Sequence, residues 1–386
     1  MISNRSFDVI IIGSGSVGTP TAFFSAEGGL RTLVIDRLPS PGQGSNKSAI
    51  GGLRATHSDP AKIRLCLRSL EIISTWKERY GDDLEWHKGG YCYVAYRPEE
   101  EKLLKDLLVV QHAFGLNVRW LDREGIREAV PGINRIGLIG GTLSPDDGNA
   151  SPLLTVEAFY KHAKRRGAEF LFGEKATGLI IEGGRVRGVR TDKGKYGAEV
   201  VINAAGPWAA EVAKFAGVEV AVTPDQHEGA VTEAVSRFLE PLVVDIRPAR
   251  GSANYYFYQH ATGQVLFCLT PSPSLWGCDV RETSEFLPMA ARRMVDVMPR
   301  LKNLRVRRTW RGLYPMTPDA FPIIGWTKEV EGCLLAVGMC GQGFMLGPGV
   351  GEMLSRVILK TQTAKDDEVL SYVSPYREFK AVEKLQ

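Results

Sequence analysis

The feature that most constrains this chain is a glycine loop that follows its first apolar run. Residues 8–12 (DVIII) form a short, β-branched, unbroken run, which predicts a buried parallel strand. Gly13, Gly15 and Gly18 follow in the spacing G-x-G-x-x-G, and a helix is predicted from Val17 to Ala26. In this motif the glycines permit the tight turn, the approach of a pyrophosphate and the close packing of helix on strand. The order strand, loop and helix therefore predicts a dinucleotide site.

A carboxylate at the end of the next strand supports this interpretation. The segment Arg31–Ile35 predicts the second strand, and Asp36 follows it eighteen residues after Gly18. A carboxylate at this place can accept hydrogen bonds from both ribose hydroxyls, and the free N–H groups of the first helix can face the phosphates. Nicotinamide and flavin enzymes share this arrangement, so the loop alone leaves the dinucleotide open.

The composition excludes several classes of protein. The 386 residues are 44% hydrophobic and 24% charged, as in globular proteins with a sizeable core. The net charge is only +4 and no long run of like charge occurs, so we expect no nucleic-acid partner. No apolar stretch is long enough to cross a bilayer, so we expect no membrane span.

The six cysteines predict neither a metal site nor a disulfide framework. They are scattered, none forms a C-x-x-C pair, and no histidine stands at ligand spacing beside them. A chain of this size does not need disulfides, and nothing in the sequence indicates export. We therefore expect reduced thiols, a cytoplasmic location and no metal.

Helical and strand patterns alternate along the rest of the chain. A long Gly-, Ser- and Pro-rich loop follows Arg37, and such loops beside a cofactor strand are often functional. Mostly β-structure is predicted for 218–309, with a hairpin at Thr262–Gly263 that follows the aromatic run NYYFY. Helices are predicted at 61–80, 99–114, 153–166 and 286–297. Nucleotide-type and β-rich segments alternate, which indicates two interleaved domains.

A second glycine cluster lies near the end of the chain, between a strand predicted at Cys333–Val337 and a helix predicted at 347–359. Two interpretations remain open on spacing alone. The glycines can direct backbone N–H groups at the negative edge of a reduced flavin, or they can let the helix pack against the sheet. The cluster consists of Gly338, Gly341, Gly343, Gly347, Gly349 and Gly351.

At this point the sequence resembles the FAD-dependent D-amino acid oxidase superfamily, which includes glycine and sarcosine oxidases. It is most similar in appearance to the flavin-bearing β subunits of sarcosine oxidase and L-proline dehydrogenase complexes. Three motifs carry the resemblance: DVIIIGSGSVG with Asp36, VINAAGPWA at 201–209, and the stretch from Trp310 to Leu354. The resemblance implies FAD rather than a nicotinamide cofactor.

The resemblance also implies the fold. We expect an α/β protein in which a Rossmann-type FAD-binding domain is interleaved with a β-sheet-rich α+β substrate domain. The expected FAD-binding segments are 1–85, 145–218 and 313–386, and the expected substrate-domain segments are 86–144 and 219–312.

The resemblance implies a set of cofactor-binding residues in four stretches of the chain. The first glycine loop and Asp36 would hold the ADP half, and the long loop would cover the pyrophosphate and approach the isoalloxazine. The VINAAGPWA motif would line the adenosine side, and the second glycine cluster would face the pyrimidine edge. The residues are Gly13, Gly15, Ser16, Val17, Gly18, Asp36, Arg37, Ser45, Asn46, Lys47, Ala49, Gly51, Gly52, Leu53, Ala176, Ala205, Gly206, Trp208, Gly312, Gly338, Gly341, Gln342, Gly343, Phe344 and Met345.

Four residues are candidates for the substrate pocket. The resemblance implies that Arg54 binds the substrate carboxylate and that Tyr256 contributes to the same pocket; an arginine fork suits a carboxylate because it is planar and always charged. The alternative for Arg54 is an ion pair within its loop. Arg311 is a second candidate for the carboxylate, although the basic run RVRRTWR is typical of a surface. Tyr314 is a weaker candidate, and no protein base is required if the amine binds deprotonated.

Some positions depart from relatives. Gly312 stands where some sarcosine oxidases attach FAD through a cysteine, so we expect non-covalent FAD. Pro152 is the nearest match to a histidine that tethers FMN, so covalent FMN is not expected, and FMN bound at a subunit interface stays open. Met345 and the neighbourhood of Phe267 match two lysines of the sarcosine oxidases, one of which activates oxygen.

The expected activity is FAD-dependent oxidation of a small or secondary amino acid such as proline, sarcosine or glycine. A hydride would pass from the substrate α-carbon to flavin N5, giving an imino acid, in the catalytic subunit of a dehydrogenase complex with partner subunits. An oxygen-using oxidase is an alternative. A flavin-carrying electron-transfer or assembly subunit without its own substrate is another.

Overall fold

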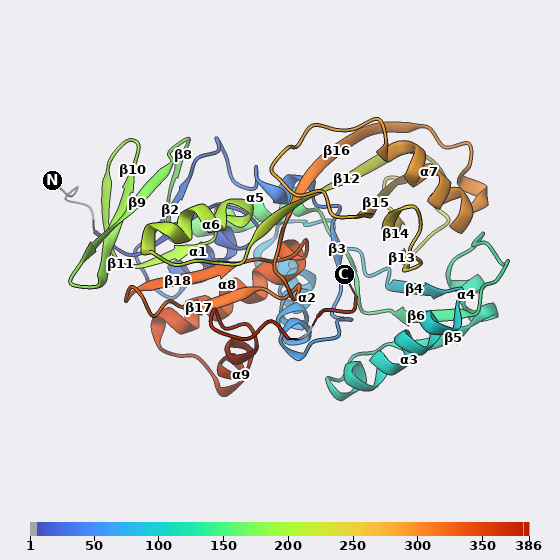
Figure 1. The fold of residues 1–386 in the computed structure, drawn as a ribbon, viewed down its shortest axis with the longest axis horizontal. Coiled ribbons are helices and arrows are strands. Elements are labelled where there is room, and N and C mark those ends of the chain that lie inside the picture. The colour runs from blue at the N-terminus through green and yellow to red at the C-terminus, as the bar shows by residue number, and fades with distance from the viewer. Residues whose placement is uncertain (1–5, 381, 386) are drawn as a thin grey trace.

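The computed structural model describes residues 6–380 and 382–385. The chain folds into two halves, each built on an eight-stranded sheet, and its first strand and its last helices belong to the same half (Figure 1). The expected α/β class is confirmed. Strand and helix segments of the two halves alternate along the chain, so neither half is continuous in sequence.

The first sheet is mostly parallel, as the β-branched run at the start of the chain predicts. Its strands pair in the order β17-β18-β11-β1-β2-β8, with the β9–β10 hairpin beside β11 and with β17 antiparallel to β18. The bounds are β1 Ser6–Ile12, β2 Thr32–Asp36, β8 Glu169–Phe172, β9 Ala176–Glu182, β10 Arg185–Thr191, β11 Lys195–Asn203, β17 Ile323–Trp326 and β18 Cys333–Val337.

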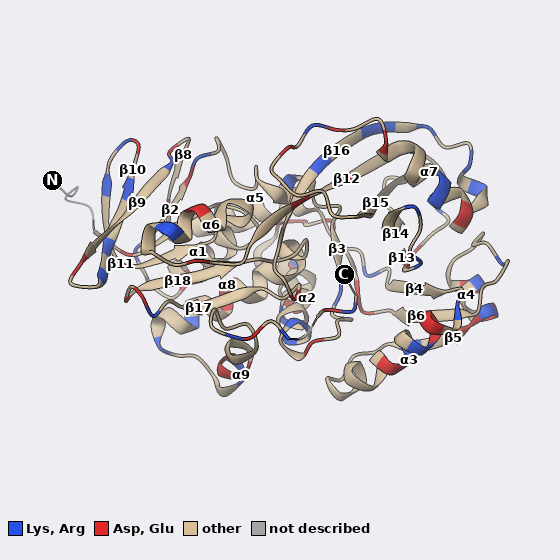
Figure 2. Ribbon diagram, viewed as in Figure 1, with Lys and Arg blue, Asp and Glu red and all other residues tan. Residues whose placement is uncertain are grey.

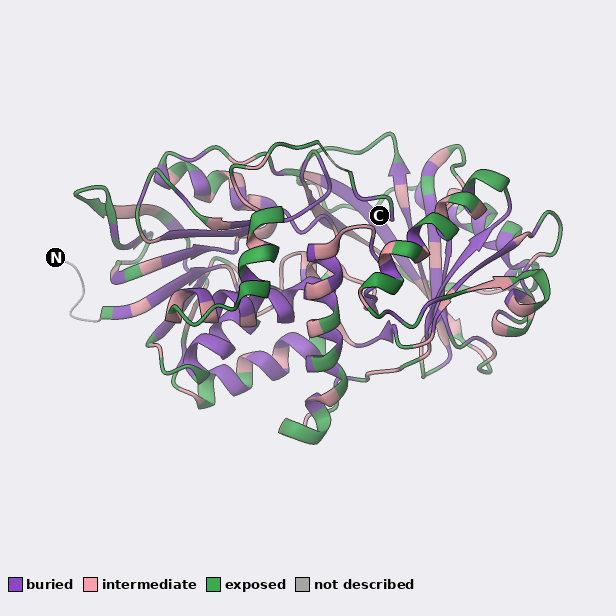
Figure 3. Ribbon diagram, turned by 90° about the horizontal axis from the view of Figure 1, so that it is seen from below, coloured by how far each residue is buried: buried purple, intermediate pink, exposed green. Residues whose placement is uncertain are grey.

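Both faces of this sheet are covered, which explains why β1 carries apolar residues without a break. Val9 and Ile11 belong to a core built with five helices, whereas Ile10 and Ile12 face a second core built with the short helix α6 (Ala209–Ala213) and the β9–β10 hairpin. The central strands β1, β2 and β18 are almost entirely buried, whereas β8 and the β9–β10 hairpin at the edges are partly exposed (Figure 3). The helices of this half are α1 Gly18–Glu27, α2 Pro60–Tyr80, α5 Pro152–Arg165, α6 Ala209–Ala213, α8 Gly343–Leu359 and α9 Ala364–Tyr372.

The second sheet is mainly antiparallel, in the order β16-β12-β15-β14-β13-β4-β6-β5. Its strands are β4 Tyr91–Ala95, β5 Arg119–Asp122, β6 Gly140–Ser144, β12 Thr223–Ala234, β13 Leu242–Asp245, β14 Gly251–Gln259, β15 Gln264–Ser272 and β16 Val306–Met316. Three helices accompany it, α3 Pro98–Ala113, α4 Arg123–Ala129 and α7 Phe286–Val297. The predicted hairpin at Thr262–Gly263 is confirmed as the β14–β15 turn.

The aromatic run on β14 alternates between two faces, as a strand requires. Tyr255 and Phe257 are buried in a core with α7, whereas Tyr258 belongs to a core with α3, and Tyr256 packs against that second core. Tyr256 therefore lies on the sheet face opposite to α7, the face on which the cavity described below opens.

Two details of the predicted secondary structure differ in the structure. The closing helix α8 begins at Gly343, four residues before the predicted start, and continues through Pro348. The long loop after Arg37 is not free of regular structure, since it contains a short 3-10 helix at Ser45–Ser48 and the two-residue strand β3 (Gly52–Leu53), which pairs with β7 (Gly148–Asn149). The boundaries of the two interleaved domains stay a proposal.

Candidate active site

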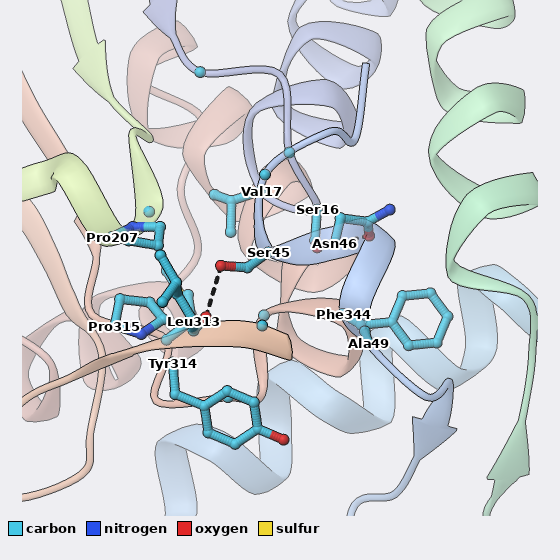
Figure 4. A pocket seen from close by; sticks show the side chains of 18 of the residues that line it. Ser16, Val17, Ser45, Asn46, Ala49, Pro207, Leu313, Tyr314, Pro315 and Phe344 are labelled. Atoms are coloured by element: carbon cyan, nitrogen blue, oxygen red, sulfur yellow. Dashed lines mark hydrogen bonds between the residues drawn. The ribbon is translucent and has the colours of Figure 1, made fainter. Parts of the chain in front are cut away.

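A long cavity runs from the carboxyl ends of β1 and β2 to the face of the second sheet. Its walls come from the first glycine loop, the long loop, the turns after β11 and β18, and strands β4, β12, β14 and β16. Figure 4 shows how close these segments lie: Ser16, Ser45, Pro207, Tyr314 and Phe344 surround one region of the cavity although they are far apart in sequence.

The first glycine loop presents backbone rather than side chains to this cavity. A Cβ atom on Gly13 would lie 2.4 Å from the carbonyl oxygen of Ala204, and Gly13 has φ of 108°, so the turn requires glycine. A Cβ on Gly15 would meet nothing within 4 Å, which leaves open space beside this part of the loop. No side chain caps α1 and no acid stands in its first turn. Thr19 N is bonded to the Gly15 carbonyl and Pro20 has no N–H, so the helix start offers an anion chiefly its positive dipole end and the N–H groups of the loop before it.

The long loop is tied to both halves by hydrogen bonds. Ser45 Oγ donates to the Leu313 carbonyl at 2.6 Å, as Figure 4 shows, and Trp310 Nε1 donates to the Ser48 carbonyl at 2.8 Å. Ser16 Oγ donates to Asn46 Oδ1 at 2.9 Å, which fixes the loop against the start of α1. The loop is therefore a rigid wall that joins the glycine loop to β16.

The distal end of the cavity combines a carboxylate with a flat aromatic surface. Asp36 accepts hydrogen bonds from the backbone and hydroxyl of Ser14, both at 2.7 Å, and from Leu38 N at 2.8 Å. The Arg37 guanidinium lies 3.9 Å from the ring centre of Trp208. A carboxylate has about four lone-pair sites, so one remains for a ribose hydroxyl.

The second glycine cluster divides into two groups with different surroundings. Gly338, Gly341 and Gly343 line the cavity. The other three glycines, Gly347, Gly349 and Gly351, instead allow α8 to pack closely against two other helices. A Cβ atom on Gly347 would lie 1.9 Å from the carbonyl oxygen of Ser16, and a Cβ atom on Gly349 would lie 2.3 Å from the carbonyl oxygen of Leu65. A Cβ atom on Gly351 would lie 2.6 Å from the backbone nitrogen of Thr21. The packing is against α1 and α2 rather than against the sheet.

The start of α8 faces the cavity as that of α1 does. Gln342 is the N-cap but makes no capping hydrogen bond, and no acid stands in the first turn. Gln342 Oε1 and His227 Nδ1 are both buried without a hydrogen-bond partner, and both residues line the cavity. The cavity therefore has two uncapped helix N-termini, two buried polar atoms without a partner, and the Asp36 carboxylate at its distal end. This set fits a dinucleotide whose half remote from Asp36 is long and polar. FAD has this form, and bound here it would supply an acceptor for a hydride.

The inner end of the cavity holds the expected substrate residues. Arg54, Tyr256 and Tyr314 line it together with Tyr91 and Tyr93. The Arg54 guanidinium carbon lies 5.8 Å from the ring centre of Tyr91 and 5.7 Å from that of Tyr93. Burial raises the pKa of Tyr91 to about 12, so this phenol is neutral at physiological pH.

Arg54 is a buried cation without an ion pair. It is 3% exposed, and it donates to the carbonyls of Thr56 and Leu385 and to His57 Nδ1. Among the described residues no carboxylate lies within 4.0 Å of its guanidinium nitrogens, so the loop ion pair considered above is not formed. The hydrogen-bond acceptors of Arg54 are neutral, and the carboxylates of Glu383 and Asp147 act on its charge only from beyond ion-pair distance. The guanidinium therefore has no direct anionic partner among the described residues, and this favours an anion in the cavity.

A histidine and an aspartate stand behind Tyr314. The His227 ring stacks on the Tyr314 ring with centroids 3.7 Å apart, and His227 Nε2 lies 3.2 Å from Asp225 Oδ2. Burial lowers the pKa of His227, while Asp225 acts in the opposite direction. The pair had a signal in the sequence, since residues i and i+2 of a strand share a face, but sequence reasoning missed it.

Four expected residues do not line the cavity. Gly18 supports the turn instead, because a Cβ there would lie 1.9 Å from the Gly13 carbonyl oxygen. Lys47 is exposed, and Leu53 is fully buried in the core. Arg311 lies outside the cavity lining and donates to the Arg281 carbonyl at 3.2 Å. It belongs to β16, whose first half carries exposed basic residues, and Figure 2 shows blue segments on this strand. The remaining expected site residues all line the cavity.

The two neighbouring residues of β15 that could match a lysine of the sarcosine oxidases face opposite sides of the sheet. Phe267 faces the core beside α7, where it stacks with Phe286, whereas Cys268 pairs in register with Tyr256. Which of them matches the lysine stays a prediction. Met345 lines the cavity as expected.

The cysteines lie apart from one another in the structure. All six cysteines are free thiols, and only Cys278 is exposed. Within residues 6–380 and 382–385, no group of three metal-ligating side chains is found and no helix is long and apolar enough to cross a membrane.

Comparison with known proteins gives a consistent result. A family model described as FAD dependent oxidoreductase matches residues 8–357. The hydrogen cyanide synthase subunit HcnC of Pseudomonas aeruginosa is 29% identical, over 92% of this chain and 93% of that protein. Glycine oxidase of Bacillus licheniformis is 24% identical, over 92% and 94%. The crystal structure of L-proline dehydrogenase from P. horikoshii superposes with a TM-score of 0.90 at 30% identity, covering 97% of this chain and 98% of that one.

Proposed function

Since this chain belongs to the FAD-dependent oxidoreductase family, we propose that it oxidises a small or secondary amino acid at the α-carbon. One observation carries the proposal: Arg54 is a buried guanidinium at the inner end of the cavity with no carboxylate partner among the described residues. A substrate carboxylate would supply the missing charge and place the substrate between Arg54 and the cofactor.

The neighbours of Arg54 suit a substrate with a small apolar body. Tyr91, Tyr93, Val244 and Tyr256 line the same end of the cavity and present rings or methyl groups. They exclude water from the reacting carbon and leave little room for a charged side chain. The similarity to an L-proline dehydrogenase structure over nearly the whole chain supports a cyclic or N-substituted amino acid such as proline or sarcosine.

The reaction needs few protein groups. FAD held by the two glycine loops would supply the acceptor for the hydride of the substrate α-carbon, so the protein itself would only have to hold the carboxylate, accept a neutral amine and exclude water. Arg54 would hold the carboxylate throughout. The phenols of Tyr256 and Tyr314 are neutral, because burial raises both pKa values, so they can donate hydrogen bonds but cannot act as bases near neutral pH.

We also propose that the chain works as the catalytic subunit of a dehydrogenase complex. A relative named as a subunit of hydrogen cyanide synthase supports an assembly of this kind. FMN at a subunit interface remains part of this proposal. Co-purification from the native source, followed by flavin analysis of the complex, tests it: a lone chain with only FAD would contradict it.

Anaerobic mixing with a panel of amino acids tests the proposed reaction. L-proline, D-proline, sarcosine, glycine and L-alanine are added separately to the yellow protein, and the loss of the flavin absorbance is followed. We expect at least one secondary amino acid to bleach the flavin. Bleaching by none would instead indicate a flavin-carrying subunit without a substrate, and fast reoxidation by air after bleaching would indicate an oxidase.

A further inference from the structure

The segment 382–385 enters the interior between the two halves of the molecule, where Figure 1 marks the end of the chain. Its burial alternates: Val382 and Lys384 are exposed, whereas Glu383 and Leu385 are 3% and 2% exposed. The Leu385 side chain belongs to the core that contains Tyr91, Tyr93 and Val244, three residues that line the substrate end of the cavity. The segment therefore supports the wall of that site.

The backbone of this segment also reaches Arg54 directly. The Leu385 carbonyl accepts a hydrogen bond from Arg54 Nη2, and the Thr56 carbonyl accepts one from Nη1. Nη1 also lies 3.1 Å from His57 Nδ1. Arginine can only donate, so His57 Nδ1 must be an acceptor, in agreement with the pKa of His57, which burial lowers to about 3.

The neutral state of His57 shows which neighbouring side chain balances the charge of Glu383. Because His57 is neutral, its Nδ1 cannot pair ionically with Glu383 Oε2, which lies 3.6 Å away. The counter-ion of Glu383 is therefore Lys62, whose Nζ lies 3.4 Å from Oε2. Neither side chain of this pair is exposed to solvent. Burial would raise the pKa of Glu383, but Lys62 and its other neighbours hold it well below the ordinary value, so Glu383 is charged.

Glu383 ties the segment to the loop that carries Arg54. Its Oε1 accepts hydrogen bonds from Ser58 N at 3.0 Å, from Ser58 Oγ at 2.7 Å and from Leu385 N at 3.1 Å. One carboxylate oxygen thus fixes Ser58, four residues after Arg54, and Leu385, whose carbonyl holds the guanidinium. Lys62 Nζ also donates to the Ala320 carbonyl at 2.6 Å, which extends the network to the loop before β17.

We propose that Glu383 and Leu385 are positioning residues of the substrate site, which hold the Arg54 fork so that its remaining donors meet the substrate carboxylate. The proposal rests on the proposed function. Five N–H donors belong to a guanidinium, and Thr56, His57 and Leu385 take three of them. Fixing one side of the fork orients the other, and it lowers the ordering cost of binding. Glu383 also keeps the Lys62 ammonium neutralised, so that Lys62 does not compete for the substrate carboxylate.

The test compares two ligands that the flavin cannot oxidise, cyclopentanecarboxylate and its uncharged amide. Their binding is measured from the change in flavin absorbance in the wild type, in Glu383→Gln and in a chain that ends at Val382. Lys384→Ala, which changes an exposed neighbour in the same segment, is the matched control. Glutamine keeps the size of the side chain but removes the charge that neutralises Lys62.

We expect Glu383→Gln to weaken cyclopentanecarboxylate binding by about 5- to 150-fold, the range found for coupled sites, with bound FAD retained. Binding of the amide and the behaviour of Lys384→Ala should not change, whereas a merely structural defect would weaken both ligands alike. The shortened chain should show the same selective loss; if it does not fold, Glu383→Gln decides. Wild-type affinity for the carboxylate in Glu383→Gln would overturn this proposal alone. A wild type that binds no carboxylate and is bleached by no amino acid would overturn the proposed function together with it.

Discussion

The phenol oxygens of Tyr256 and Tyr314 lie 2.8 Å apart, which joins β14 and β16 across the cavity. One hydroxyl donates to the other, so a single O–H of the pair is left for a ligand. Tyr314 is further fixed by the His227 ring stacked on it and by Gly341, where a Cβ would lie 2.1 Å from the Tyr314 ring. The pair is therefore a rigid part of the site whose two hydroxyls depend on each other.

This dependence gives a measurable coupling. Tyr256→Phe and Tyr314→Phe should each lower the free energy of unfolding by about 1–2 kcal/mol, because each leaves a buried hydroxyl without its partner. The double variant should cost less than the sum, since no unpaired hydroxyl then remains. Urea unfolding of the four proteins measures the difference, and Tyr372→Phe, at an exposed tyrosine, serves as the control. Additive effects would mean that the two hydroxyls act independently.

Arg54→Ala should leave the flavin spectrum intact and weaken binding of the amino acid substrate. The loss of a charge-assisted bidentate contact costs about 2–3 kcal/mol, or roughly 30- to 150-fold in affinity. Arg54→Lys should recover only part of this, because an ammonium cannot reproduce the planar fork. Arg311→Ala, at an arginine outside the cavity, is the matched control. Wild-type turnover by Arg54→Ala would mean that Arg54 is structural.

The protein should release its FAD on acid or heat precipitation. Gly312 offers no side chain for a covalent bond, and a Cβ there would already lie 2.6 Å from the Ser48 Cβ, so the backbone passes closely at this point. The flavin of the supernatant and of the pellet is measured after precipitation. Flavin that remains in the pellet would show a covalent link through another residue.

Oxygen should be a poor electron acceptor. Reoxidation by oxygen passes through superoxide, and a fixed positive charge near the flavin speeds it. The resemblance to the sarcosine oxidases implies that Phe267 or Cys268, and Met345, stand where those enzymes carry lysines, and a bound substrate carboxylate would neutralise Arg54. Reoxidation of the reduced protein in air-saturated buffer, followed by stopped flow, should be much slower than turnover with an artificial dye. Reoxidation that keeps pace with reduction by substrate would identify an oxidase.

Stability should depend on pH through Asp147, whose carboxylate accepts hydrogen bonds from Ala55 N and Thr56 Oγ1 in the loop after Arg54. Burial raises the pKa of Asp147 to about 6, so between about pH 4 and pH 6 the folded protein holds a proton that the unfolded chain has released. The contribution of Asp147 to stability therefore falls as the pH rises through this window.

The comparison of Asp147→Asn with the wild type isolates this contribution. The wild type loses the contribution of Asp147 between pH 4 and pH 6, and the variant does not. The free energy of unfolding of the variant minus that of the wild type should therefore increase over this range and then level off. Thermal or urea unfolding at several pH values measures it. Asp146→Asn should show no such increase over this window, since the pKa of Asp146 is lowered, chiefly by its hydrogen bond with Lys88. A flat difference for Asp147→Asn would place the pKa of its carboxyl at an ordinary value.

The sequence predicted the parts of the fold that depend on local pattern. The β-branched run at β1, the glycine loop and the amphipathic helix α7 each carry their own signal, and α7 is confirmed at its predicted ends. The start of α8 was misplaced, because Pro348 and the glycines around it look like a loop. Contacts of Gly347 with Ser16 and of Gly349 with Leu65 stabilise the helix there, and these lie far away in sequence.

The sequence predicted those site residues that a local motif or a family resemblance indicates. It did not predict the site residues whose place depends only on contacts between segments that are distant in sequence. The resemblance to a family indicated Arg54 and Tyr256, and both residues line the cavity. The face on which Arg311 or Phe267 lies depends on strand register, which one residue of misalignment reverses. Glu383 carried no signal, since it lies in a polar stretch and is buried only because Lys62 and Ser58 receive it.

The most direct test of the central claim is anaerobic reduction of the flavin by L-proline and by L-proline carrying deuterium at the α-carbon. If the α-carbon hydrogen passes to the flavin, the yellow absorbance disappears on mixing, one imino acid forms for each flavin, and the deuterated substrate bleaches more slowly. The other amino acids of the panel are examined in the same way. A flavin that stays oxidised with every one of them, in a protein that retains its FAD, would contradict the account.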